Sequence, residues 1–214
     1  MRCMQRQFYS SKVNASSELL HKLSSKVDFV LIGGWAVHSY LGLQKSMDID
    51  IAIDYPSTGY FRNYGIRKYE GININYSEID DVTVDLFLPE FSDRDLPFPV
   101  KEILANYVKI ENIKVVDKEL LLLLKVWGYF ANDKTKIQKD IIDVASLLLY
   151  GNINLSKVKL QAKKHGLQKR RTTDVMLEYL DKGNALAEFI SGDLKSYTSL
   201  AEKCKKNIQK VFDY

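Results

Sequence analysis

Apolar and polar positions alternate along the first half of the chain with the period of β-strands. Residues 47–54 alternate Met or Ile with aspartate or alanine, which predicts a half-buried strand. The apolar run over 28–32 predicts a buried strand that stops at Gly33 and Gly34. Three more strands are predicted over residues 66–70, 72–76 and 83–88. Helices are predicted beside them over residues 16–26 and 35–41.

The second half of the chain has a helical period instead. Apolar residues recur at positions 137, 141, 144, 145 and 148, which predicts a helix over 134–150. Further helices are predicted over residues 119–127, 154–165, 168–181 and 193–212. The patterns together predict an α+β protein. A small mixed β-sheet with flanking helices is expected over residues 1–116, followed by a helical bundle over residues 117–214.

Composition excludes several classes of protein. The chain has 214 residues, 46% of them hydrophobic and 27% charged, which is enough apolar material for a packed core. Cys3 and Cys204 lack the spacing of a zinc site or a disulfide framework. No apolar run reaches the ~20 residues that span a bilayer, and the N-terminus has no secretion-signal pattern, so we expect a cytoplasmic protein without membrane contact. The motifs of zinc hydrolases, serine hydrolases and P-loop ATPases are missing.

Charge is divided unevenly between the two halves. Residues 1–115 hold 13 Lys and Arg against 15 Asp and Glu, a net charge of −2, whereas residues 116–214 hold 18 against 12, a net charge of +6. The segment 157–171 has no acidic residue. Its basic residues are Lys157, Lys159, Lys163, Lys164, Lys169, Arg170 and Arg171. Such a segment attracts a polyanion, although a solvated helix face explains it equally well.

Three aspartates in the predicted strands need a chemical explanation. Asp48 and Asp50 are expected on one face of their strand, ~6.6 Å apart, where their like charges repel unless a cation or hydrogen-bond donor lies between them. Asp85 interrupts the apolar strand 82–88 and completes a three-carboxylate group if the two strands are neighbours. Oxygen ligands of this kind suit a hard divalent ion. The alternative is that these acids simply occupy an exposed strand face.

Gly33 and Gly34 lie where a predicted strand meets a predicted helix. Glycine lets the backbone approach a phosphate closely, and the N–H groups of a helix N-terminus favour anionic oxygen. A glycine pair alone is a weak signal. Its combination with an Asp-x-Asp strand and a later isolated strand aspartate is more specific, and it predicts a site for phosphate and metal together.

Residues 31–53 resemble the signature of the DNA polymerase β-like nucleotidyltransferases, in which a Gly-Gly-x-Ala helix precedes an Arg-x-x-Asp-x-Asp strand. More narrowly, they resemble the AbiEii/MenT toxin nucleotidyltransferases and the lincosamide and aminoglycoside nucleotidyltransferases. The residues that the resemblance implies as ligands of two Mg²⁺ ions, or of Mn²⁺, are Asp48, Asp50 and Asp85. It also implies Gly33 and Gly34 as the triphosphate loop. Lys45, followed by Ser46, stands where many relatives have Arg, and a lysine keeps the charge for a phosphate contact but loses bidentate geometry.

A second stretch of sequence strengthens this resemblance. The Leu-Lys-Val-Trp around Lys125, followed by the helix with Lys136, Lys139, Asp140 and Asp143, is similar to a pattern of the AbiEii-like group: a Lys, then Arg/Lys-x-x-Lys/Arg-Asp-x-x-Asp, then Leu-Leu. The resemblance implies that Lys125 contacts nucleotide phosphate and, as a catalytic residue, stabilises the developing charge. It implies that Asp140 supports or orients this contact, and that Lys139 and Asp140 belong to the nucleotide site. The four residues at 136–143 share one helix face, so a salt-bridged surface stripe is the alternative.

The function expected from these features is transfer of a nucleoside monophosphate from an NTP such as ATP to an acceptor hydroxyl. The first choice of acceptor is RNA, in particular the 3′ end of tRNA as in the MenT-like toxins. The residues expected to bind it are Lys157, Lys163, Lys164, Arg170 and Arg171. An antitoxin of a type IV toxin–antitoxin pair is then an expected protein partner. The alternatives are a small-molecule acceptor, as for the antibiotic nucleotidyltransferases, and a catalytically silent module that binds a nucleotide or a partner protein.

Overall fold

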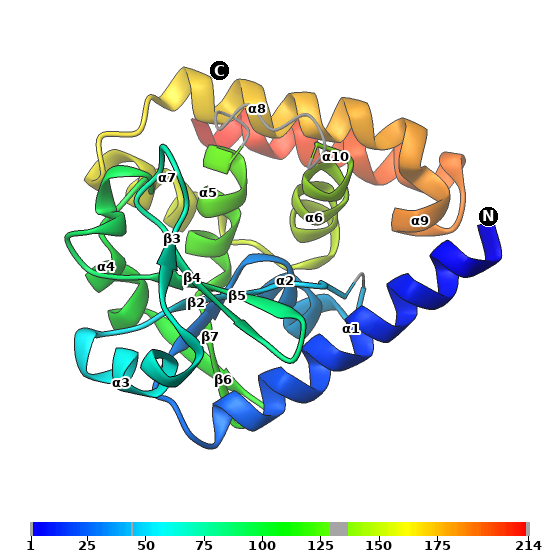
Figure 1. Cartoon of the computed structure of the whole chain (residues 1–214). Coiled ribbons are helices and arrows are strands. Elements are labelled where there is room, and N and C mark those ends of the chain that lie inside the picture. Colours follow the sequence, from blue (N-terminus) through cyan, green and yellow to red (C-terminus); the bar gives the residue numbers. More distant parts are fainter. Residues whose placement is uncertain (1, 44, 129–136, 213–214) are drawn as a thin grey trace. The chain divides into compact units, whose positions relative to one another are not determined.

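The computed structural model describes residues 2–43, 45–128 and 137–212. The chain is an α+β protein, as the sequence predicted, and it divides into two compact units, residues 1–117 and 118–214 (Figure 1). Unit 1 contains the β-sheet and unit 2 is helical. No helix within the described ranges is both long and apolar enough to cross a membrane.

The described part of unit 1 is built on a seven-stranded mixed sheet with the strand order β3-β4-β5-β2-β1-β7-β6. The strands are β1 (Val30–Ile32), β2 (Ile49–Ala52), β3 (Arg67–Lys68), β4 (Asn75–Ile79), β5 (Val82–Phe87), β6 (Tyr107–Ile110) and β7 (Ile113–Val116). The pairs β2–β5 and β1–β7 are parallel, and the other neighbouring strands are antiparallel. The strand that carries Asp50 therefore lies in the middle of the sheet, next to the strand that carries Asp85.

The hairpin formed by β6 and β7 was not predicted from the sequence. Its two strands are joined by Glu111 and Asn112, which both have positive φ angles, 47° and 70°. Two-residue hairpin turns need such angles, and the sequence signal for them is normally Asn-Gly or Asp-Gly. A Glu-Asn pair lacks that signal because a glutamate rarely adopts a left-handed conformation.

The helices of unit 1 lie beside this sheet. They are α1 (Arg2–Ser24), α2 (Gly33–Leu41), α3 (Thr58–Phe61) and α4 (Val100–Ala105), with short 3₁₀ turns at Tyr55–Ser57, Arg62–Tyr64 and Ser92–Arg94. α1 contacts β5, and α2 contacts β1 and β2 (Figure 1). The prediction that the first helix starts near residue 16 was wrong, because it rested on a leucine spacing that begins only at Leu19. The predicted stop of α2 is confirmed, since Gly42 closes it in the left-handed conformation.

On each of the two central strands β2 and β5, the side chains that alternate with the aspartates are buried in the core. Ile49 and Ile51 of β2, and Val84 and Leu86 of β5, are fully buried, whereas the aspartates between them are only partly buried. This is the alternation that the sequence predicted. Burial of the apolar rows holds β2 and β5 in one register, because a slip by one residue would bring the aspartates into the core.

Unit 2 is a bundle of helices. They are α5 (Lys118–Gly128), α6 (Ile137–Tyr150), α7 (Leu155–Lys164), α8 (Lys169–Lys182), α9 (Ala187–Ser191) and α10 (Leu194–Phe212). Its core includes the leucines of α5 together with Tyr179 of α8 and both Tyr197 and Phe212 of α10. The short helix α9 was not predicted, and the predicted start of α6 at residue 134 lies outside the described residues.

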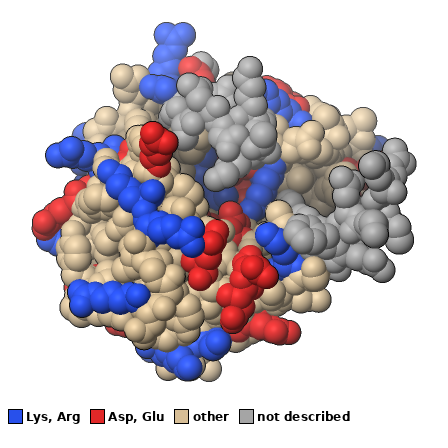
Figure 2. Space-filling view, in the orientation of Figure 1, with Lys and Arg blue, Asp and Glu red and all other residues tan. Residues whose placement is uncertain are grey.

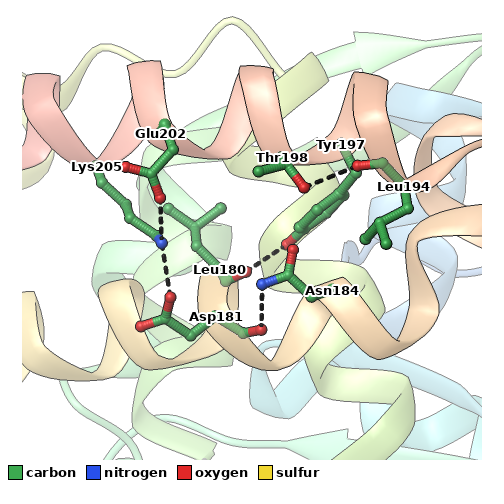
Figure 3. Close-up of polar contacts among 8 residues, drawn as sticks. All are labelled: Leu180, Asp181, Asn184, Leu194, Tyr197, Thr198, Glu202 and Lys205. Atoms are coloured by element: carbon green, nitrogen blue, oxygen red, sulfur yellow. Dashed lines mark hydrogen bonds and ion pairs between the residues drawn. The ribbon is translucent and has the colours of Figure 1, made fainter.

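Polar contacts join α8 to α10 around the buried ring of Tyr197 (Figure 3). The Tyr197 hydroxyl donates to the carbonyl of Leu180 at 2.7 Å, and Lys205 lies 2.6 Å from Asp181 and 2.8 Å from Glu202. A Cβ at Gly183 would overlap the Tyr197 hydroxyl, so glycine is required where the tyrosine meets the end of α8. The buried polar end of Tyr197 is thus satisfied by backbone.

Candidate functional site

Asp50 and Asp85 lie side by side on neighbouring parallel strands. The register of β2 and β5 pairs Asp50 directly with Asp85, so both side chains project from the same face of the sheet. Their backbone neighbours on each strand are buried apolar residues, which fixes the two carboxylates on the opposite face. Asp85 is therefore a neighbour of Asp50, which the sequence had left open because the alternation within one strand does not decide which strands pair.

Gly33 packs directly against Asp50. It lies at the junction of β1 and α2, has a φ of +66°, and a Cβ built on it would overlap Oδ2, Cγ and Cβ of Asp50. The Asp50 side chain thus occupies the space that any larger residue at position 33 would need. The acidic pair and the diglycine turn are parts of one site, and this site includes the N-terminus of α2, a helix of nine residues.

Two hydrogen bonds connect Asp48 through Ser46 to Ser16 of α1. It lies just before the first residue of β2, Ile49, and its Oδ1 accepts a hydrogen bond from the hydroxyl of Ser46. Ser46 is buried, and its carbonyl accepts a hydrogen bond of 2.6 Å from the Ser16 hydroxyl of α1. Ser46, expected at a phosphate, contacts an aspartate in the structure. Ser16 was missed because it lies thirty residues away in sequence.

Tyr69 is a further residue of the site, and no sequence signal could have found it. Its hydroxyl donates a hydrogen bond of 2.8 Å to Oδ1 of Asp85, and its ring stacks on Tyr76 with centroids 4.4 Å apart. Burial and the hydrogen bond to Asp85 raise the pKa of the Tyr69 phenol, so that it stays protonated at neutral pH. The phenol fixes one oxygen of Asp85.

Lys45 is exposed at a cavity of about 310 Å³ between α1, α2 and the β6–β7 turn. The cavity lining also includes Trp35, His38 and Glu111, but none of the three aspartates of the site. Trp35 itself is 3% exposed, so its indole is mainly part of the core. The described contacts therefore do not bring Lys45 to the aspartates.

In unit 2, Lys125 is paired with two acids of α6. Its Nζ lies 3.2 Å from Asp140 and 2.8 Å from Asp143, and the three side chains are only 13%, 18% and 2% exposed. Burial raises the pKa of Asp143, while the charges of Lys125 and Lys139 oppose this shift. The structure thus brings together Lys125, Lys139, Asp140 and Asp143. Lys136, expected on the same face, lies outside the described residues.

The basic segment of unit 2 separates into structural and surface residues. Lys157 lies 3.3 Å from the buried carboxylate of Glu119, which also accepts a hydrogen bond from the backbone of Asn154. Lys159 donates to the carbonyl of Val211 at 2.8 Å. These two lysines therefore hold α7 in place. The other basic residues of the segment are Lys163, Lys164, Lys169, Arg170 and Arg171. On the face seen in Figure 2, basic and acidic side chains lie close to one another.

The aspartate group can be compared with the needs of a metal ion. Within residues 2–43, 45–128 and 137–212, no three His, Cys, Asp or Glu side chains are arranged as a ready-made metal site. Mg²⁺, however, usually takes only one or two protein carboxylates and completes its shell with water and substrate phosphates. Asp50 and Asp85 fit that requirement, with Asp48 two residues before Asp50 as a further oxygen donor.

Alanine at position 33 is expected to destabilise the protein by about 2 kcal/mol or more, because it adds the overlap with Asp50 to a backbone strain of roughly 1–2 kcal/mol. The matched control is Gly42→Ala, since Gly42 has the same φ of +66° but nothing within 4 Å of an added Cβ. Urea unfolding of both variants measures the difference. Equal losses of stability would show that Asp50 does not occupy the space at Gly33.

Tyr69→Phe is expected to lower the free energy of unfolding by about 1 kcal/mol, because a hydrogen bond to a charged acceptor is lost at a half-buried position. Tyr55→Phe serves as the control, since its hydroxyl donates at 3.1 Å to the neutral carbonyl of Pro89 and the residue is 50% exposed. Its effect should be smaller. Thermal unfolding of the two variants measures both, and an equal loss would contradict the contact with Asp85.

No protein-family model matches the chain, and no curated protein sequence matches it.

Proposed function

We propose that the chain is a metal-dependent nucleotidyltransferase that transfers a nucleoside monophosphate from an NTP to an acceptor hydroxyl. The observation that supports this most directly is the pair Asp50 and Asp85, side by side on parallel strands and packed against Gly33 at a helix N-terminus. A carboxylate pair gathers divalent cations, and a glycine turn at a helix N-terminus accepts phosphate. Both halves of an NTP–metal complex therefore have a partner in one site.

The residues that would hold Mg²⁺ are Asp48, Asp50 and Asp85. The proposal includes two Mg²⁺ ions. When bound there, they would stabilise the charge on the phosphates and lower the pKa of the acceptor hydroxyl. The hydrogen bonds from Ser46 to Asp48 and from Tyr69 to Asp85 keep these carboxylates oriented. Such preorganisation matters because a protein catalyses phosphoryl transfer mainly by positioning the reacting groups and by stabilising their charge.

In the proposed reaction the oxygen of the acceptor hydroxyl forms a bond to the α-phosphorus. The bond from that phosphorus to the α,β-bridging oxygen breaks, pyrophosphate leaves with the bonding electrons, and the hydroxyl proton is released to solvent. The backbone at Gly33 and Gly34 receives the phosphates. The phosphate contacts considered for Lys125 and Lys45 stay predictions. The supporting role of Asp140 and the place of Lys139 at the nucleotide stay predictions as well.

The proposed acceptor is RNA, with the 3′ end of tRNA as the first choice. Its support is the net charge of +6 on residues 116–214 and the basic residues around the α7–α8 turn. Cytoplasmic location, and a role as the toxin of a toxin–antitoxin pair, are further parts of this proposal. Charge reversal at Lys163, Lys164, Arg170 and Arg171 should weaken RNA binding and flatten its salt dependence.

The direct test is incubation of the full chain with Mg²⁺, each α-³²P-labelled NTP in turn, and total tRNA. Label in RNA supports the proposal. Label in an added aminoglycoside or lincosamide, and none in RNA, would keep the nucleotidyl transfer and overturn the acceptor. Binding of NTP without transfer to any acceptor would overturn the proposed activity in favour of a silent binding module.

A further inference from the structure

A row of paired residues crosses the sheet of unit 1 from the diglycine turn to the edge strand β3. The register pairs Ile32 with Asp50, Asp50 with Asp85, Asp85 with Tyr76, and Tyr76 with Arg67. Residues paired directly across neighbouring strands project from the same face of a sheet. The aspartates, the tyrosine and the arginine therefore lie on one face, in the strand order β2-β5-β4-β3.

Side-chain contacts connect the outer part of this row. The ring of Tyr69 stacks on Tyr76 with centroids 4.4 Å apart, and its hydroxyl donates to Asp85 at 2.8 Å. The Arg67 guanidinium lies 5.4 Å from the centroid of the Tyr76 ring. Two tyrosine rings and a guanidinium group thus extend the site from the aspartates towards the edge of the sheet.

The ion pair of Arg67 with Glu78 does not account for this arginine. The two side chains are 2.8 Å apart but 54% and 52% exposed, and an exposed pair of this kind adds little to stability. Glu78 accepts from one nitrogen of the guanidinium, which carries five N–H donors in all. Arg67 can therefore bind an anionic group of a ligand while it keeps its contact with Glu78.

The two ends of the row have different places in the proposed transfer. The triphosphate is proposed at Gly33, which follows Ile32 at the β1 end of the row. In phosphoryl transfer the attacking and leaving oxygens lie roughly in line, on opposite sides of the phosphorus. With pyrophosphate leaving at the β1 end, the acceptor approaches over β5, β4 and β3. It then meets Tyr69, Tyr76 and Arg67.

These three side chains match the chemistry of one nucleotide. Aromatic rings bind bases, and an arginine binds a phosphate through paired N–H donors. Neighbouring strands lie ~4.8 Å apart, so Arg67 is roughly 10 Å across the sheet from Asp85, with Tyr76 between them. A hydroxyl at the aspartates, a base at the tyrosines and a phosphate at the arginine follow in the order found at the 3′ end of RNA. A polycationic aminoglycoside would be repelled by the arginine.

We propose that Tyr69, Tyr76 and Arg67 form the subsite for the last nucleotide of the acceptor RNA, with its base against the two tyrosines and its 5′ phosphate at Arg67. This inference rests on the proposed function, because it takes a 3′ hydroxyl at Asp50 and Asp85 as the acceptor. It adds that unit 1 itself recognises the end of the RNA, and that it does so with little regard to base sequence, since every base has a face that stacks.

The phosphate contact is tested by nucleotidyl transfer to single-stranded oligoribonucleotides that differ in one linkage. The first has only phosphodiesters, the second has a neutral methylphosphonate between its last two nucleotides, and the third has it in the middle of the strand. With the wild-type chain, the terminal replacement should raise KM for RNA about tenfold, the effect of losing one hydrogen bond to a charged group. The internal replacement should change KM much less.

The Arg67→Gln variant completes this comparison. It should raise KM for the unmodified RNA about tenfold, and the terminal methylphosphonate should then cause no further increase, because both changes remove the same contact. KM for the NTP should stay as in the wild-type chain. Lys68→Gln is the matched control, since it removes one charge from the next residue of β3, whose side chain projects from the opposite face of the sheet. It should leave KM for RNA unchanged.

The base contact is tested at Tyr76, because Tyr69 also orients Asp85. Tyr76→Leu should raise KM for RNA about tenfold, the usual effect of losing one stacked base. Tyr76→Phe keeps the aromatic ring and should retain most of the affinity. KM for the NTP should be the same in both variants, which distinguishes loss of acceptor binding from damage to the metal site.

The outcomes separate this inference from the proposed function. Equal KM values for the three RNAs with the wild-type chain, or an unchanged KM for RNA in Tyr76→Leu, overturn the subsite and leave transfer to RNA intact. A terminal methylphosphonate effect that persists in Arg67→Gln also overturns it. If the wild-type chain labels no RNA, the proposed acceptor and the subsite both fail, while transfer to another acceptor stands. Should Tyr76→Leu not fold, Arg67→Gln with the three RNAs still decides.

Discussion

Asp50→Asn and Asp85→Asn are each expected to reduce nucleotidyl transfer by about 10³-fold or more while leaving the protein folded. The carboxylates of this pair are the proposed ligands of Mg²⁺, and a metal ion contributes several kcal/mol to phosphoryl transfer, where ~4 kcal/mol corresponds to 10³ in rate. Asparagine has the same shape as aspartate, so the packing against Gly33 is kept. Rates with labelled NTP and RNA, at saturating Mg²⁺, measure the loss.

Stability distinguishes this result from simple misfolding. Asp50 and Asp85 are paired residues with like charges, so removing one charge should leave the free energy of unfolding unchanged or raise it. Asp81→Asn is the matched control, since Asp81 is exposed in the β4–β5 turn and has a φ of +61°, which asparagine tolerates. Retained activity in both site variants would refute the proposed metal site.

Lys125→Met is expected to lower the free energy of unfolding by about 3–5 kcal/mol, because it removes the cation that lies 2.8 Å from the buried carboxylate of Asp143. Asp143→Asn should cost much less, since it removes the charge that burial disfavours. The double variant Lys125→Met with Asp143→Leu should regain much of the lost stability. Urea unfolding of the three variants measures these differences, and equal losses in both single variants would contradict the argument.

The decrease in the free energy of unfolding of the Lys125→Met variant should also depend on pH. Burial already raises the pKa of Asp143, and removing the lysine raises it further. Between the unfolded and the folded pKa, the folded state then binds more protons than the unfolded state, so stability decreases as the pH rises. The destabilisation should therefore be larger at pH 8 than at pH 5. A loss that does not change with pH would show that Asp143 is not left charged and buried.

Local patterns were sufficient to predict most elements of the fold. The period of two in 47–54 and the helical period in 137–148 indicated the central strand and α6, because each depends only on which face of one element is buried. The hairpin of β6 and β7 was missed because its Glu-Asn turn has no standard signal. The early start of α1 was missed because the residues before position 16 show no apolar period.

For the candidate site, too, local patterns indicated some of the residues and not others. Asp50, Asp85 and Gly33 were visible as unusual residues in their local patterns. Tyr69 and Ser16 could not be recognised in the same way. The hydrogen bond from Tyr69 to Asp85, and the one from Ser16 to the carbonyl of Ser46, leave no pattern in the local sequence. Lys45, considered as a phosphate contact, lines a cavity whose lining contains none of the three aspartates.

By itself, the amino-acid sequence determined which residues are buried on the central strands β2 and β5 and on α6, the α+β class, and the presence of acids that packing does not require. The tertiary structure alone decided that Asp85 stands opposite Asp50, that Asp50 fills the space left by Gly33, and that Lys125 is already paired with Asp140 and Asp143. The physical reason is that hydrophobic periodicity is a property of neighbouring residues. Strand register and ion pairing depend instead on contacts between segments far apart in the chain.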